Sequence, residues 1–260
     1  MFNIANLFTA SNLLAGFLSI LFAVTGHIDL AVWAIFAGAF FDFLDGFAAR
    51  IFKTSGDLGK QLDSLADMVT FGVAPGMLMM VVLTINLSND YSSTEVQTGF
   101  LQWVDSLLNL NPTAFYPLAG LIIPFFSLFR LAKFNIDTRQ TTSFIGLPTP
   151  VNTLFFTTFP LAIVFTNEAM SSYIQVVFHP IFIVLTILIM GLLMVSEIPF
   201  FSLKFNKTGI KGNEIRYLFL LISMIIIVLF SVWAIALIVF LYLILSIIEN
   251  TFLTSKKNEI

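Results

Sequence analysis

Long apolar stretches separated by short polar segments dominate the pattern of this 260-residue sequence. An α-helix needs roughly 20 residues to cross the hydrocarbon core of a bilayer, and eight stretches are close to that length. They are residues 5–25, 30–52, 60–87, 113–134, 148–167, 174–201, 216–231 and 233–250. The last two are close enough to form a tight helical hairpin. The pattern therefore predicts an all-α fold, a polytopic membrane helical bundle of about eight transmembrane helices.

Composition excludes the soluble classes of protein. Hydrophobic residues make up 58% of the chain and charged residues only 10%, whereas a soluble globular domain carries about 25% charged residues. The net charge of −3 offers no basic surface to a nucleic acid, so no nucleic-acid partner is expected. The chain has no cysteine, and its two histidines, His27 and His179, are too few for a histidine-based zinc or haem site.

The basic residues predict the orientation of the bundle. With eight spans, all twelve lysines and arginines fall at the same membrane face: Arg50, Lys53, Lys60, Arg130, Lys133, Arg139, Lys204, Lys207, Lys211, Arg216, Lys256 and Lys257. The opposite loops, residues 26–29, 88–112 and 168–173, contain none. Because loops rich in lysine and arginine stay in the cytoplasm, we expect this face and both termini to be cytoplasmic, in a multi-pass protein of the inner (cytoplasmic) membrane.

Four aspartates lie where lipid disfavours them. Asp42 and Asp45 fall in the second predicted span, and Asp63 and Asp67 fall in the third. A carboxylate inside a spanning helix costs on the order of 3 kcal/mol, so four unpaired ones would cost about 12 kcal/mol. That sum is comparable to the whole stability of a typical domain, so something must compensate these charges.

The spacing of the four aspartates predicts a metal site. On a helix, Asp42 and Asp45 are about 60° apart, and Asp63 and Asp67 are about 40° apart. A short loop, residues 53–58, joins the two helices, which must therefore be antiparallel neighbours with their acids at similar depth. A cluster of carboxylate oxygens suits Mg²⁺ or Mn²⁺, and two ions would balance four negative charges.

Small residues and an arginine accompany the acids and suggest a diphosphate ligand. Gly46 and Gly59 lie on the two acidic faces, where a missing side chain lets a bulky ligand approach the backbone. Ala49 keeps the same wall small, and Arg50 provides a planar fork suited to a phosphate. A lipid with a diphosphate head would match both the membrane walls and the cytoplasmic opening. Helix-end salt bridges of the acids with basic neighbours and a cation pathway through the membrane are the alternatives.

The complete pattern resembles the signature of the CDP-alcohol phosphatidyltransferase family. Its eight specified positions are all present as Asp42-x2-Asp45-Gly46-x2-Ala49-Arg50-x8-Gly59-x3-Asp63-x3-Asp67. The resemblance implies transfer of a phosphatidyl or similar group from a CDP-linked lipid to an alcohol, with release of CMP. It also implies a homodimer. The family assignment therefore predicts an enzyme rather than a transporter.

The resemblance also implies roles for single residues. Asp42 and Asp63 would bridge two ions, Asp45 would complete the first ion's ligands, and Asp67 would complete the second and act as the general base. Gly46 and Arg50 would contact the CDP-lipid, the arginine at its diphosphate. A base within hydrogen-bond reach is also what an alcohol needs, because its pKa is far above 7.

Three further segments resemble the membrane-integral phosphatidylserine synthases of the same family: residues 5–16, 130–135 and 144–150. Asn6 and Thr9 would then lie near the CDP head group. The sequence departs from this branch at Ala5, where a proline is usual, which bears only on the start of the first helix. We expect one membrane-embedded domain over residues 1–260, with the catalytic core in about 1–200 and a C-terminal helix pair in 216–250.

The predicted reaction is therefore CDP-diacylglycerol plus L-serine giving phosphatidylserine plus CMP. The carboxylate of serine needs a cation, and Arg130, Lys133 and Arg139 lie on the predicted cytoplasmic face. These three residues could instead set the topology by reaching to the interface. Glycerol 3-phosphate or an inositol phosphate is the alternative acceptor, and a cation transporter using the four acids is the alternative outside this enzyme class.

Overall fold

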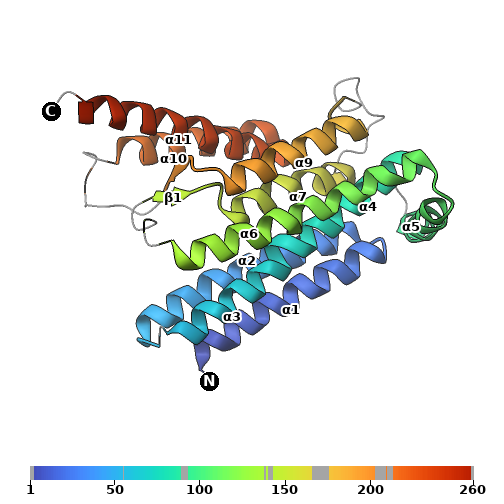
Figure 1. Cartoon of the computed structure of the whole chain (residues 1–260), viewed down its shortest axis with the longest axis horizontal. Helices are drawn as coiled ribbons and strands as arrows, with labels where there is room; N and C mark the ends of the chain where they lie inside the picture. The colour runs from blue at the N-terminus through green and yellow to red at the C-terminus, as the bar shows by residue number, and fades with distance from the viewer. Residues whose placement is uncertain are drawn as a thin grey trace.

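The computed structural model describes residues 3–54, 56–88, 93–137, 139, 143–165, 176–202, 209 and 213–258. These residues form a helical bundle (Figure 1). Its helices are α1 (Ile4–Val24), α2 (Ile28–Ile51), α3 (Asp57–Asp67), the π-helix η1 (Met68–Val73), α4 (Ala74–Ser88), α5 (Ser93–Leu108), the 3-10 helix η2 (Pro112–Leu121), α6 (Ile122–Ile136), α7 (Thr149–Phe165), α9 (Pro180–Val195), α10 (Glu214–Phe230), the 3-10 turn η3 (Ser231–Trp233) and α11 (Ala234–Asn258).

The helices confirm a polytopic, apolar helical bundle. Within the described residues, five helical stretches are long and apolar enough to cross a membrane: Ile4–Val24, Ile28–Ile51, Asp57–Leu87, Pro112–Ile136 and Glu214–Thr251. The last stretch contains both α10 and α11, which turn back on each other at η3, where Ser231 has a φ of 47°. α7 and α9 are shorter apolar helices. Every predicted span therefore contains a helix.

One predicted span is only partly helical. The stretch 174–201 was expected to be a single helix, but α9 ends at Val195, and strand β2 (Pro199–Phe201) follows. β2 pairs antiparallel with β1 (Ser143–Ile145). Ser196 leaves the helical conformation, and the ring of Pro199 is incompatible with a continuing helix. The all-α prediction is thus correct except for this small two-stranded sheet.

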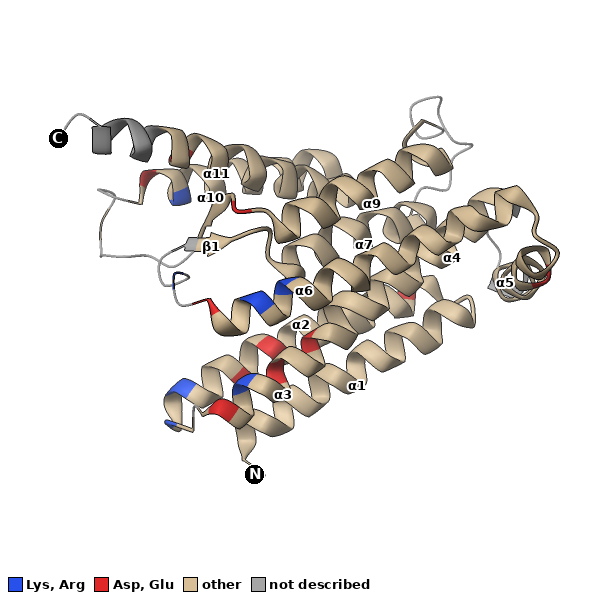
Figure 2. Cartoon of the chain, viewed as in Figure 1, with Lys and Arg blue, Asp and Glu red and all other residues tan. Residues whose placement is uncertain are grey.

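Charge is distributed unevenly along the bundle. The helices run alternately between two ends, and both chain termini lie toward the end that also holds the α2–α3 and α6–α7 connections (Figure 1). Among the described residues, lysines and arginines gather toward this end, while the opposite end carries acids alone (Figure 2). We call it the basic end; the end of α2 and the α2–α3 connection contribute Arg50 and Lys53 to it, and the α6–α7 connection contributes Arg139. For the described residues, the predicted placement of these charges at one face is consistent with this arrangement; Lys204, Lys207 and Lys211 lie outside the described residues.

Close packing brings α1 against η1, next to the acids. A Cβ added to Gly16 would lie 2.5 Å from Thr70 Oγ1, so only glycine allows this approach. The Thr70 hydroxyl donates to the backbone oxygen of Asn12 over 2.8 Å. Thr70 and Asn12 are completely buried. This contact fixes the start of η1, and with it the end of α3, against the middle of α1.

Candidate active site

Three of the four aspartates converge. Asp42 from α2 and Asp63 and Asp67 from α3 each present a carboxylate oxygen, and these three oxygens lie within 4.8 Å of one another. The four-residue spacing of Asp63 and Asp67 puts both on one face of α3, and α2 packs beside that face as the short connection requires. Sequence periodicity and antiparallel packing are therefore enough to assemble this cluster.

Asp67 is held by a partner from α1. Its Oδ1 accepts a hydrogen bond of 3.1 Å from the Asn12 side-chain amide, and both side chains are buried. Nothing in the acidic motif indicates this partner, so the sequence analysis did not include Asn12. The available signal was a polar residue in the middle of an apolar span, which has to find a hydrogen-bond partner inside the protein.

Asp45 lies beside the three-carboxylate cluster. Its Oδ2 accepts a 2.7 Å hydrogen bond from the hydroxyl of Thr9 on α1, and Asp45 is 6% exposed. Asp45 and Asp63 both line a pocket, so the fourth carboxylate faces the same space as one member of the cluster. The four acids thus occupy adjoining positions between α1, α2 and α3.

The pocket has a volume of about 220 Å³ and lies between the basic-end halves of α1, α2 and α3. It is lined by Ala5, Asn6, Thr9, Asp45, Gly46, Ala49, Thr54, Gly56, Gly59, Lys60 and Asp63. This lining includes five of the six residues expected to contact a CDP-lipid, namely Asn6, Thr9, Gly46, Ala49 and Gly59. At Gly46 an added Cβ would meet nothing within 4 Å, so the backbone here borders open space.

Arg50, the sixth expected contact, is not among the residues lining the pocket. Its side chain is exposed, and its Nε donates to the Gly46 backbone oxygen over 2.9 Å. The guanidinium therefore folds back along its own helix. Sequence spacing places Arg50 one turn after Gly46 but cannot predict which rotamer the arginine adopts.

The donor set of the cluster fits a hard divalent cation. All three convergent ligands are carboxylates, and no histidine or cysteine belongs to the metal-ligand groups found among the described residues. Oxygen-only sites favour Mg²⁺, Mn²⁺ or Ca²⁺ over zinc. Partly buried carboxylates this close together repel one another strongly, and a bound cation relieves that repulsion.

Arg130 is the buried cation near these acids. It is 3% exposed, its Nε donates to the Leu147 backbone oxygen over 3.3 Å, and its guanidinium carbon lies 4.9 Å from the centre of the Phe134 ring. It interacts electrostatically with the Asp67 carboxylate. Within the described part of the chain, no carboxylate forms a salt bridge with Arg130. Arg130 is therefore a buried cation without an acidic salt-bridge partner among the described residues.

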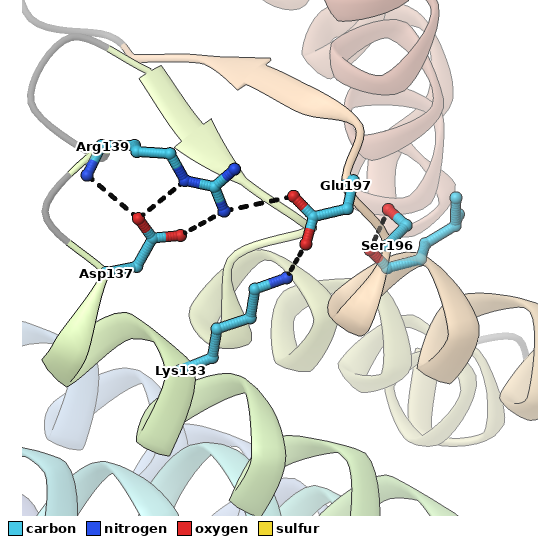
Figure 3. A network of polar contacts seen from close by, with 6 residues as sticks. Lys133, Asp137, Arg139, Ser196 and Glu197 are labelled. Carbon is cyan, nitrogen blue, oxygen red and sulfur yellow. Dashed lines mark hydrogen bonds and ion pairs between the residues drawn. The ribbon is translucent and has the colours of Figure 1, made fainter.

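Lys133 and Arg139 belong to a separate, exposed network at the basic end (Figure 3). The Glu197 carboxylate lies between them, accepting from Lys133 Nζ through Oε1 and from Arg139 Nη2 through Oε2 at 3.2 Å. Arg139 also donates to both carboxylate oxygens of Asp137. Unlike Arg130, these two predicted acceptor residues are each paired with an acid.

Ion pairing keeps the carboxylates of this network charged. Hydrogen bonds from Arg139 lower the pKa of Asp137 to about 2, and the hydrogen bond from Lys133 lowers the pKa of Glu197. Hydrogen bonds to Asp137 in turn raise the pKa of Arg139. The two acids and two basic residues pair within one network, so their formal charges cancel.

Comparisons with known proteins agree with this geometry. The sequence model of the family described as CDP-alcohol phosphatidyltransferase matches residues 2–190, which include all four aspartates. The CDP-diacylglycerol–serine O-phosphatidyltransferase of Bacillus subtilis is 37% identical over 142 residues, 55% of this chain and 66% of that protein. The Helicobacter pylori (strain ATCC 700392 / 26695) protein of the same description is 29% identical over 253 residues, 96% and 92% of the two chains. The Methanocaldococcus jannaschii one is 32% identical over 206 residues, 77% of each.

Proposed function

Because the chain belongs to the CDP-alcohol phosphatidyltransferase family, we propose that it transfers the phosphatidyl group of CDP-diacylglycerol to L-serine. The products are phosphatidylserine and CMP. The observation that carries this proposal is the convergence of Asp42, Asp63 and Asp67 beside a pocket lined by Thr9, Gly46 and Gly59. The family match includes the acids themselves, which favours phosphatidyl transfer over the cation pathway.

In the proposed reaction, the serine hydroxyl attacks the phosphorus that carries the diacylglycerol group. A new oxygen–phosphorus bond forms, and the bond from this phosphorus to the oxygen of CMP breaks. Asp67 accepts the proton of the hydroxyl, since a base within hydrogen-bond reach is needed to activate an alcohol. The Asn12 amide fixes one oxygen of Asp67, which would hold this carboxylate in place for the proton transfer.

Divalent cations fit this scheme through the four carboxylates. Asp42, Asp45, Asp63 and Asp67 would hold two Mg²⁺ or Mn²⁺ ions, which would polarise the diphosphate and stabilise the leaving CMP. The residues Asn6, Thr9, Ala49 and Gly59 would border the CDP moiety. With its small residues, the pocket leaves room for a ligand to approach the backbone.

Serine is the acceptor that the surrounding charges suit best. The buried guanidinium of Arg130 can receive a carboxylate and lies close to the proposed base. Lys133 and Arg139 are already neutralised by Glu197 and Asp137, so they offer little net positive charge to a phosphate monoester. Relatives described as CDP-diacylglycerol–serine O-phosphatidyltransferases support the same acceptor.

The basic end supports a proposed orientation of the protein in the membrane. We propose that this end faces the cytoplasm of a cell whose inner membrane holds the bundle, so that serine and CMP exchange with the cytoplasmic pool. Both termini would then be cytoplasmic. The homodimer implied by family resemblance stays a prediction.

A panel of acceptors tests the proposed function. Purified protein is incubated in mixed micelles with CDP-diacylglycerol, Mn²⁺ and one acceptor, and CMP release is measured. We expect release with L-serine and none above background with glycerol 3-phosphate or inositol phosphate. If CMP is released only with a phosphorylated acceptor, that acceptor and not serine is the substrate. If no acceptor gives CMP release, the enzymatic proposal is wrong.

A further inference from the structure

Lys60 is the cationic residue in the pocket lining, a position that the acidic motif does not specify. The lining contains two carboxylates, Asp45 and Asp63, and no other lysine or arginine among the described residues. Lys60 lies three residues before Asp63 on α3, nearly one helical turn away. Lys60 is therefore the residue that brings a positive charge to the lining beside Asp63.

The side chain of Lys60 is held in place by α6. Its Nζ donates to the backbone oxygen of Asn135. The Asn135 side-chain amide in turn donates to the Ser64 hydroxyl over 2.8 Å, so Asn135 contacts α3 on both sides of Asp63. An ammonium has three donors, and this contact uses one of them. Two donors of the ammonium are therefore not used by this contact.

The charges in the site call for such a cation. Two divalent ions would balance the four aspartates, which leaves the two negative charges of a diphosphate diester uncompensated. Arg50, the expected phosphate clamp, folds back onto the Gly46 backbone oxygen outside the lining. Lysine acts as a point charge on phosphates and needs no planar match to its ligand.

Resting on the proposed function, we propose that Lys60 binds the diphosphate of the CDP-lipid in this pocket. Asn135 acts as a positioning residue, because its backbone oxygen accepts a hydrogen bond from the Lys60 ammonium. Lys60 is then a specificity determinant for the nucleotide diphosphate, distinct from the four carboxylates. It contributes to binding of the donor lipid rather than of the acceptor.

Equilibrium binding of soluble nucleotides tests this proposal without any acceptor. CDP and cytidine share the base and sugar and differ in the diphosphate, so their affinities are compared in the presence of Mn²⁺ for wild type, Lys60→Met and Lys60→Arg. Because Lys60→Met loses one charge-assisted contact, its affinity for CDP should be about tenfold weaker than that of the wild type. Its affinity for cytidine should change by less than about twofold. Lys60→Arg should restore most of the CDP affinity. If cytidine binds too weakly to measure, CMP takes its place.

Lys53→Met is the matched control, because Lys53 is an exposed lysine at the same end and does not line the pocket. It should leave CDP binding unchanged. Unaltered CDP affinity in Lys60→Met would overturn the proposal, and so would equal losses for CDP and cytidine, which indicate a structural role. A raised serine KM with unchanged CDP binding would assign Lys60 to the acceptor instead. Failure of the serine assay in wild type would count against the proposed function alone.

Discussion

The side-chain amide of Asn12 donates a 3.1 Å hydrogen bond to Oδ1 of Asp67, joining two buried residues that lie 55 positions apart. This bond fixes the orientation of the carboxylate that we assign as the general base. α1 therefore contributes to the proposed active site, although the acidic motif lies wholly in α2 and α3. The arrangement makes Asn12 a positioning residue for Asp67.

Replacing Asn12 tests this relationship. Asn12→Ala frees the Asp67 carboxylate to rotate, and misplacing a catalytic group should lower kcat by roughly tenfold to a hundredfold. The KM for CDP-diacylglycerol should change little, because Asn12 does not line the pocket. Ser11→Ala is the control, since the Ser11 hydroxyl is exposed and bonds only to the Leu7 backbone oxygen of its own helix. A wild-type kcat in Asn12→Ala would remove its positioning role.

Arg130 should dominate recognition of the acceptor carboxylate. Arg130→Lys keeps the charge but loses the planar fork, and we expect the KM for L-serine to rise by about tenfold while the KM for CDP-diacylglycerol stays constant. Arg139→Gln should have a smaller effect on the serine KM, because Arg139 is already paired with Asp137 and Glu197. Steady-state kinetics with each substrate varied provides the measurement. A larger effect at Arg139 than at Arg130 would reverse the assignment.

Gly146 should be irreplaceable for structural reasons. Its φ is +80°, and an added Cβ would lie 2.2 Å from the Met194 backbone oxygen. Gly146 N–H also donates to Ile198 O over 2.9 Å, which ties the segment before α7 to the end of α9. The left-handed conformation alone costs an alanine about 1–2 kcal/mol, and the clash adds to it. Thermal unfolding of Gly146→Ala should therefore occur at a clearly lower temperature.

Gly99→Ala serves as the comparison for that experiment. An added Cβ at Gly99 meets nothing within 4 Å, and Gly99 lies in helix α5. Alanine in a helix is favoured over glycine by about 1 kcal/mol, so stability should be unchanged or slightly higher. Equal destabilisation by the two substitutions would contradict the special backbone role of Gly146.

The natural absence of cysteine allows the orientation to be tested directly. Leu58→Cys places a thiol at an exposed position of the basic end, and Asn109→Cys places one at an exposed position after α5. In intact spheroplasts, a membrane-impermeant maleimide should label Asn109→Cys alone. Leu58→Cys should react after the membrane is permeabilised. The opposite labelling pattern would place the basic end outside the cell.

Sequence periodicity predicted most of the bundle and the acid cluster, because both depend on local rules. Helical spacing places Asp63 and Asp67 on one face, and the short connection after α2 brings Asp42 to them. The same reasoning predicted the helix within each span. It extended the sixth span to residue 201, since apolarity does not reveal that Pro199 begins a strand paired with β1.

Side-chain partners from distant segments were beyond sequence reasoning. The spacing of the acidic motif does not show that Asn12 would reach Asp67 or that Thr9 would reach Asp45. Lys133 and Glu197 are 64 residues apart, so their pairing depends on how α6 meets the segment after α9. These contacts depend on tertiary packing and rotamer choice, which a single sequence does not encode in a local pattern.

Metal dependence of CMP release measures the central claim most directly. Wild-type protein with CDP-diacylglycerol and L-serine should lose its activity in EDTA and regain it with excess Mg²⁺ or Mn²⁺. The rate of CMP release by Asp67→Asn should be at least about a hundredfold below the wild-type rate at every metal concentration, because the base is missing. Asp42→Asn should be inactive or need far more metal. Undiminished CMP release in EDTA, together with wild-type rates in both variants, would contradict the claim that these carboxylates form a catalytic metal site.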